Sequence, residues 1–161
     1  MKNPNKISTI KLMAPPCPQC SQQGQLVRKL TVRSLLIPKL KNRVLDIAYY
    51  LCMSSDCKVS YYSNTPNEIF TTKDVKVPIW YKKDAHPKYA CYCNKITDEE
   101  VINTVKETGL SDMQEIIKFL REKVKCACVA MNPSGQCCTP LFPEAITIGL
   151  HARQKEKTEN I

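Results

Sequence analysis

The chain has 161 residues, of which ten are cysteine and two are histidine, and its formal net charge is +9. This length allows one ordinary domain or two small ones, and the scarcity of histidine excludes a histidine-rich metal site. No apolar run approaches the ~18 residues of a membrane-spanning helix, so we expect no membrane span.

The N-terminus lacks the basic segment and apolar run of a secretory signal peptide. We therefore expect a cytoplasmic protein in a reducing compartment, where closely spaced cysteines are more often metal ligands or redox groups than disulfides. A disulfide scaffold with a missing leader is the alternative. Residues 1–13 are basic and polar, and we predict a flexible lead there.

Three segments rich in β-branched and aromatic residues follow and predict strands, at 25–33, 44–51 and 58–62. Shorter strand-like runs occur at 68–70 and 75–80. The polar segment after them contains His86 and a proline, and we place a domain boundary there. The predicted domains are a β domain over 14–85 and a helical domain over 86–150.

Two cysteine pairs flank the first predicted strands. Cys17 and Cys20 form a C-P-x-C turn, and Cys52 and Cys57 form a wider pair after the second strand. Two such turns beside a small sheet are typical of a zinc ribbon with a closed four-thiolate site, which favours a structural zinc over a catalytic one. The alternative is a set of four buried, reduced cysteines, but a β unit this short needs a metal to be stable.

The second domain begins with a helical pair. Thr97 and Glu100 form a capping box before a predicted helix at 98–108, and Gly109 ends it. Ser111 and Gln114 have the same spacing and predict the start of a second helix. A third helix is predicted from Pro143 to about residue 150, and the charged tail over 151–161 is expected to fray.

Six thiols lie at the two outer ends of the helical pair: Cys91, Cys93, Cys126, Cys128, Cys137 and Cys138. Thiolates on opposed loops are how a small domain holds an iron–sulfur cluster. The single-residue spacing of Cys91 and Cys93 predicts that they share one iron. The other iron then takes one ligand from Cys126 or Cys128 and one from Cys137 or Cys138.

The motif C-Y-C-N at Cys91–Asn94, followed by T-D-E-E at Thr97–Glu100, resembles the 2Fe–2S domain of bacterioferritin-associated ferredoxins. The ending N-P-S-G-Q-C-C and the two earlier cysteine pairs resemble the cysteine-rich N-terminal domain of CopZ-type copper chaperones of archaea. This resemblance implies one zinc and one 2Fe–2S cluster, with Cys128 and Cys138 as ligands and Cys126 and Cys137 as alternates. In that family a separate domain with an M-x-C-x-x-C loop carries Cu(I), and no such loop occurs here.

The sequence therefore predicts an α+β protein with a small zinc-ribbon-like β domain followed by a small helical 2Fe–2S domain. We expect no enzyme, because no Ser/His/Asp arrangement or phosphate-binding loop is present. The predicted function is one-electron transfer or metal handling, including reduction of Cu(II) to Cu(I). The partner would be a redox or metal-trafficking protein, or a separate copper-carrying domain. The alternative is a zinc-ribbon regulator that binds nucleic acid through the basic stretch Arg28–Arg43 and uses the cluster as a redox or iron sensor.

Overall fold

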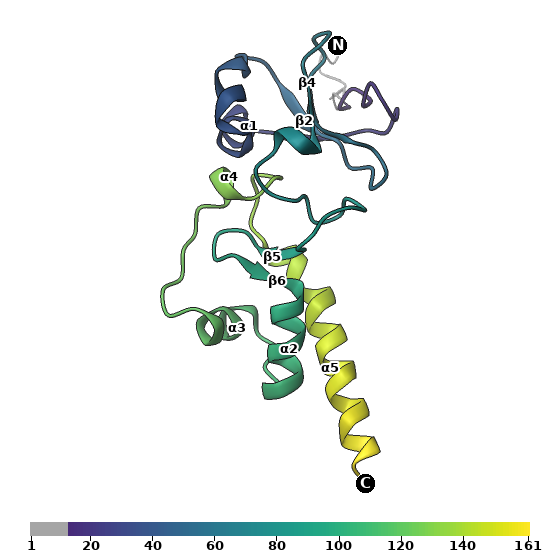
Figure 1. Cartoon of the computed structure of the whole chain (residues 1–161), viewed down its shortest axis with the longest axis vertical. Helices are drawn as coiled ribbons and strands as arrows, with labels where there is room; N and C mark the ends of the chain where they lie inside the picture. Colours follow the sequence, from purple (N-terminus) through teal and green to yellow (C-terminus); the bar gives the residue numbers. More distant parts are fainter. Residues whose placement is uncertain (1–12) are drawn as a thin grey trace, which may run out of the picture.

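The computed structural model describes residues 13–161 (Figure 1). The flexible lead predicted over 1–13 therefore lies outside the described residues, apart from Met13. A small antiparallel sheet with one helix forms one end of the molecule, and a helical unit forms the other. This arrangement confirms the predicted α+β class. None of the helices in residues 13–161 combines the length and apolarity that crossing a bilayer requires.

The N-terminal sheet has the strand order β1-β2-β3-β4, and each neighbouring pair is antiparallel. The strands are short: β1 is Gln25–Val27, β2 is Tyr49–Leu51, β3 is Val59–Tyr62 and β4 is Ile69–Thr71. All four residues of β3 are buried, because this strand is central and both of its faces are covered. The sheet therefore fixes the segments that carry the first two cysteine pairs.

The prediction of one strand over 25–33 is wrong in its second half. After β1 the chain forms helix α1, Lys29–Leu35, whose buried residues are Thr31, Val32 and Leu35. This i, i+1, i+4 spacing puts one helical face on the core, and packing outweighs the strand propensity of the β-branched residues. The predicted strand at 44–51 is reduced to β2 because the 3-10 helix η1, Pro38–Arg43, and an irregular segment precede it.

The segment after β4 is not a strand, although its apolar residues suggested one over 75–80. It begins with the 3-10 helix η2, Thr72–Asp74, and then runs as an irregular linker. Val75 makes an isolated bridge to Leu36, and Ile79 is buried in the same core. These side chains anchor the linker to the sheet, so the alternation of apolar residues reflects anchoring rather than sheet pairing.

The C-terminal unit opens with a two-stranded hairpin that the sequence did not predict, and continues with helices. Its elements are β5 Tyr89–Cys91, β6 Ile96–Thr97, α2 Asp98–Thr108, α3 Met113–Leu120, α4 Cys128–Met131, the 3-10 helix η3 Thr139–Leu141 and α5 Phe142–Glu159. The predicted helix at 98–108 is confirmed, with the Thr97–Glu100 capping box in place and Gly109 at a φ of 76°. The second helix is capped by Asp112 rather than Ser111, since the Asp112 carboxylate accepts the backbone N–H of Glu115.

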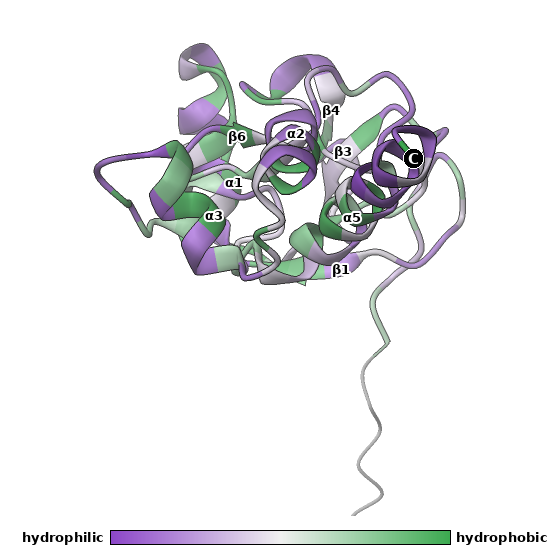
Figure 2. Cartoon of the chain, turned by 90° about the horizontal axis from the view of Figure 1, so that it is seen from below, coloured by the Kyte–Doolittle hydropathy of each residue, from purple (hydrophilic) through white to green (hydrophobic). Residues whose placement is uncertain are grey.

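Helices α2 and α5 pack closely against each other (Figure 1). A side chain in place of Gly149 would meet Val105 Cβ at 2.7 Å and the carbonyl oxygen of Ile102 at 2.8 Å, so the close approach requires glycine. Helix α5 continues to Glu159, through residues that we expected to fray. Figure 2 shows the C-terminal turns of α5 as hydrophilic, in keeping with their exposed side chains.

The two units touch through the segment that carries the last cysteines. Helix α1 packs against α4, and the Thr31 hydroxyl donates to the carbonyl of Val129 at 2.6 Å. The buried Tyr61 hydroxyl of β3 donates to the carbonyl of Pro133 at 2.7 Å. The sheet unit therefore supports the N-P-S-G turn that leads to Cys138. The boundary between domains 14–85 and 86–150 remains a prediction.

Candidate metal centres

Four cysteines of the N-terminal unit form one compact set. The sulfurs of Cys17, Cys20, Cys52 and Cys57 lie within 4.8 Å of one another. The Cys17–Cys57 and Cys20–Cys52 sulfur distances are 4.0 and 3.6 Å. A tetrahedral zinc with Zn–S bonds of ~2.3 Å needs sulfurs about 3.8 Å apart. The donor set and its size therefore fit zinc, and four thiolates leave no position for a substrate or catalytic water.

The protein surroundings affect the four thiols differently. Burial raises the pKa of Cys52 to about 12. At Cys20 burial acts in the same direction, but the backbone N–H of Gln22 and the neighbouring thiols outweigh it and lower its pKa to about 7. A bound zinc ion deprotonates its thiol ligands outright. Cys52 therefore depends on the metal for its ionisation.

The linker before the second unit braces the Cys52–Cys57 turn. The Tyr81 hydroxyl donates to the carbonyl of Cys52 at 2.5 Å. The Lys82 ammonium is buried and donates to the carbonyls of Ser54 at 2.7 Å and Cys57 at 3.0 Å. A buried cation beside four thiolates also offsets part of their negative charge. Lys82 thus contributes to the zinc site, a role that the basic character of the linker alone does not predict.

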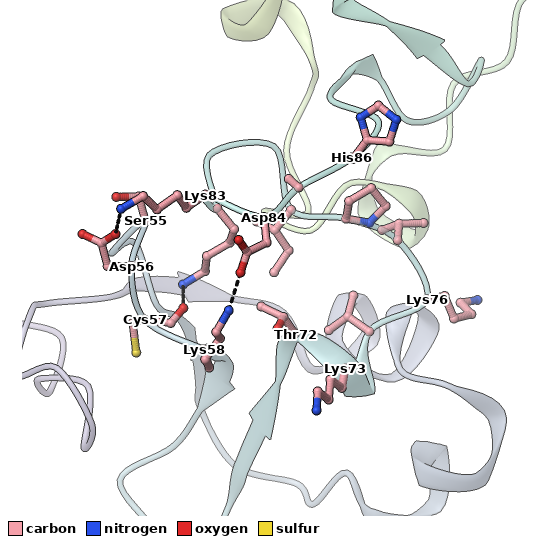
Figure 3. A pocket seen from close by; sticks show the side chains of 16 residues that line it. Ser55, Asp56, Cys57, Lys58, Thr72, Lys73, Lys76, Lys83, Asp84 and His86 are labelled. Carbon is pink, nitrogen blue, oxygen red and sulfur yellow. Dashed lines mark hydrogen bonds and ion pairs between the residues drawn. The ribbon is translucent and has the colours of Figure 1, made fainter.

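A cavity of about 380 Å³ lies between this turn and the linker (Figure 3). Its rim carries an ion pair between Lys58 and Asp84 and another between Lys83 and Asp56, whose charged atoms are 3.1 Å apart. These side chains are mostly exposed, so each pair adds little stability. Figure 3 places His86 on the opposite wall, well away from the sulfur of Cys57.

Four cysteines of the C-terminal unit form two pairs rather than one tetrahedral set. The Cys93 and Cys128 sulfurs are 3.5 Å apart. The Cys91 thiol interacts directly with that of Cys138, and this contact, together with the Asn94 amide, lowers the pKa of Cys91 to about 5. The same contact and burial raise the pKa of Cys138. This contact therefore favours loss of the proton from Cys91 before that of Cys138.

The pairing differs from the expectation that Cys91 and Cys93 face the same metal ion. Cys91 ends strand β5 and Cys93 lies in the following turn, and each meets a thiol from the far loop. Within residues 13–161, one group of three or more metal-binding side chains has its ligand atoms within 4.8 Å of one another, and that group is the zinc set. Two separate pairs suit a dinuclear group with two thiolates for each metal.

Three N–H groups point at the sulfurs of these pairs. The Asn94 amide donates to Cys91 at 3.3 Å, and the Asn132 amide donates to Cys138 at 3.4 Å. The backbone N–H of Ala127 donates to the Cys93 sulfur at 3.2 Å. Both asparagine side chains are buried and make further hydrogen bonds. Asn94 also bonds to the backbone N–H and carbonyl of Lys125, and the Asn132 oxygen accepts twice from Ser134. Such donors stabilise thiolate charge.

The two remaining cysteines are exposed. Cys126 and Cys137 both interact with the Cys128 thiol. The Cys137 thiol also contacts the Thr139 hydroxyl at 3.1 Å. Cys91, Cys93 and Cys138 are buried, and Cys128 is partly exposed. Burial therefore separates the four predicted ligands from the two alternates, and the choice between them stays a prediction.

The zinc set lies in a segment of the chain that matches a known zinc-binding domain. Residues 14–76 match the CopZ zinc binding domain. This match covers all four cysteines of the set, so zinc binding follows both from the donor geometry and from the family model.

The similarity extends into the C-terminal unit. The chain is 30% identical over 122 residues to the copper chaperone CopZ of Archaeoglobus fulgidus, which covers 76% of this chain and 57% of that protein. The X-ray structure of the N-terminal domain of A. fulgidus CopZ superposes with a TM-score of 0.62 at 28% identity, covering 76% of this chain and 91% of that one. The chain thus spans a little over half the length of the curated relative and nearly all of its N-terminal domain. Metal binding by the N-terminal unit fits these findings.

Proposed function

We propose that the chain binds zinc at Cys17, Cys20, Cys52 and Cys57, binds a 2Fe–2S cluster at Cys91, Cys93, Cys128 and Cys138, and serves in one-electron transfer for metal handling. The observation that carries the cluster proposal is the arrangement of the second set as two thiol pairs with N–H donors at the sulfurs. When bound, an all-thiolate 2Fe–2S cluster takes up and releases one electron.

The cysteines and asparagines of the second site would have separate roles in holding the cluster. Cys91 with Cys138 would hold one iron, and Cys93 with Cys128 the other. The Asn94 and Asn132 amides orient the first pair and offset its negative charge, which raises the reduction potential. Asn94 further fixes the loop at Lys125, so the two arms of the site keep their spacing.

The likeness to a copper chaperone extends the proposal to copper. The reduced protein would give one electron to Cu(II), and the resulting Cu(I) would pass to a separate carrier. Such a carrier, or another redox or metal-trafficking protein, is the partner that this function requires.

An anaerobic titration tests the redox proposal. Reduced protein mixed with Cu(II) and a Cu(I)-specific chelator should yield about one Cu(I) for each cluster that is reoxidised, because the couple is a one-electron one. Thiols also reduce Cu(II), so two control variants are needed. Cys126→Ala/Cys137→Ala removes the exposed thiols, and cluster-free Cys138→Ala measures the Cu(I) that forms without a cluster. Equal Cu(I) yields from the cluster-free and the cluster-containing protein would contradict the proposal.

A further inference from the structure

The linker before the second unit makes direct contacts with the turns of both thiol sets. We call Cys52–Cys57 the zinc turn. The Tyr81 hydroxyl and the Lys82 ammonium donate to its carbonyl groups. The backbone N–H of Lys83 donates to a further one, that of Ser55, at 3.0 Å. The zinc turn contains no helix or strand of its own, so its shape depends on the metal and on these contacts.

The same linker is bonded to the segment between Cys91 and Cys93. Tyr92 lies between these two cysteines and is 3% exposed. Its hydroxyl accepts the backbone N–H of Trp80 at 3.0 Å and donates to the carbonyl of Pro78 at 2.7 Å. Both cysteines are 4% exposed, so the position of Tyr92 decides whether their thiols are covered.

Trp80 joins the two sides of the linker. Its ring stands edge-on to the ring of Tyr81, with 4.9 Å between the centroids, and lies 6.3 Å from the ring of Tyr92. The side chain also packs against the buried cores of both units. Because close-packed side chains transmit displacement, a shift of Tyr81 disturbs the packing that Trp80 makes beside Tyr92.

We infer that zinc binding at the first set keeps the segment Cys91–Cys93 closed through this linker. With zinc bound, the ordered zinc turn offers fixed carbonyl groups to Tyr81 and Lys82, and the linker in turn holds Tyr92. Without zinc, the turn loses the folding free energy that the metal supplies. The linker then loses its partners on that side, and the segment opens more often. Zinc binding thereby shields the empty second thiol set from solvent.

The inference rests on the proposed zinc and does not require the proposed cluster. Metal–sulfur bonds would hold the segment by themselves once a cluster is present, so the coupling acts on cluster-free protein. The linker is the shared element, because its docked position is favoured from the zinc turn on one side and from Tyr92 on the other. Coupling between two sites typically changes an equilibrium by roughly 5- to 150-fold.

Alkylation of cluster-free protein by iodoacetamide tests the inference. Buried thiols react only when their segment opens, so the rate follows the opening equilibrium. Trypsin cleaves after Lys88 and Lys95, and the peptide 89–95 then carries Cys91 and Cys93 as its only cysteines. We expect this peptide to be alkylated about tenfold faster in zinc-free Cys52→Ala than in the wild-type protein with one zinc per chain.

Two tyrosine variants decide whether the linker carries the effect. Tyr92→Phe keeps the ring but removes both hydroxyl bonds to the linker. In this variant the removal of zinc should change the alkylation rate of peptide 89–95 less than twofold. The matched control is Tyr89→Phe, which removes a hydroxyl from a ring 5.2 Å from that of Tyr92 and leaves both bonds in place. The control should keep the tenfold effect.

Trp80 gives a second measurement, because it is the only tryptophan in the chain. Its emission should shift to longer wavelength when zinc is removed from the wild-type protein, since the ring leaves its packed position. An alkylation rate that does not depend on zinc would overturn the inference. A tenfold effect that persists in Tyr92→Phe would also overturn it, because general unfolding would then expose the thiols. Wild-type protein that holds no zinc would instead remove the zinc proposal, and the inference with it.

Discussion

We expect Cys138→Ala to lose the visible absorption of the reconstituted protein and nearly all of its iron, whereas Cys137→Ala keeps both. The two thiols are adjacent in sequence, but Cys138 is 2% exposed, contacts Cys91 and accepts from the Asn132 amide. Cys137 faces solvent. Removing Cys138 therefore deprives one iron of a buried thiolate ligand. Iron content and absorption spectra measure the difference.

The same contrast applies to the other arm of the site, where Cys128→Ala should lose the cluster and Cys126→Ala should keep it. Ligand exchange is the hazard here, because both exposed thiols interact with Cys128. Electron paramagnetic resonance of the reduced protein distinguishes a replaced ligand from an unchanged one. An unaltered signal in Cys128→Ala, together with cluster loss in Cys126→Ala, would show that Cys126 is the ligand.

The second large effect is expected at the zinc set. Cys52→Ala should reduce zinc from one per chain to near zero after dialysis against a chelator, because a buried ligand is lost from a closed four-thiolate site. Zinc supplies about 10 kcal/mol or more of folding free energy in small zinc modules. The two cysteine turns should therefore become accessible to protease.

Cluster absorption should survive in Cys52→Ala. The contacts that support the cluster loop come from Thr31 and Tyr61, and these belong to the core of α1 and the sheet rather than to the cysteine turns. Cys126→Ala is the control, since it removes an exposed cysteine without touching the zinc set. Unchanged zinc content in Cys52→Ala would show that the assignment of this set is wrong.

Local signals were enough to predict the spacing of the zinc set and helix α2. A C-x-x-C turn and a capping box are each encoded within a few residues, so they can be recognised without tertiary information. The same holds for the end of α2 at Gly109, whose positive φ suits glycine.

Features that depend on distant contacts could not be predicted from the sequence. The run from Gln25 to Arg33 has strand propensity throughout, and only its packing decides that the second half is α1. The contact between Cys91 and Cys138 joins two segments that are distant in the sequence, so residue spacing does not predict it. The role of Lys82 likewise depends on carbonyl groups about 25 residues earlier in the chain.

The composition of the purified protein tests the proposal most directly. Protein made without oxygen, or reconstituted with iron and sulfide, should be red-brown and contain about two iron, two acid-labile sulfide and one zinc per chain, as the two thiol sets require. Reduction by one electron should bleach the colour reversibly. Colourless protein that holds zinc but no iron or sulfide after reconstitution would contradict the proposed cluster.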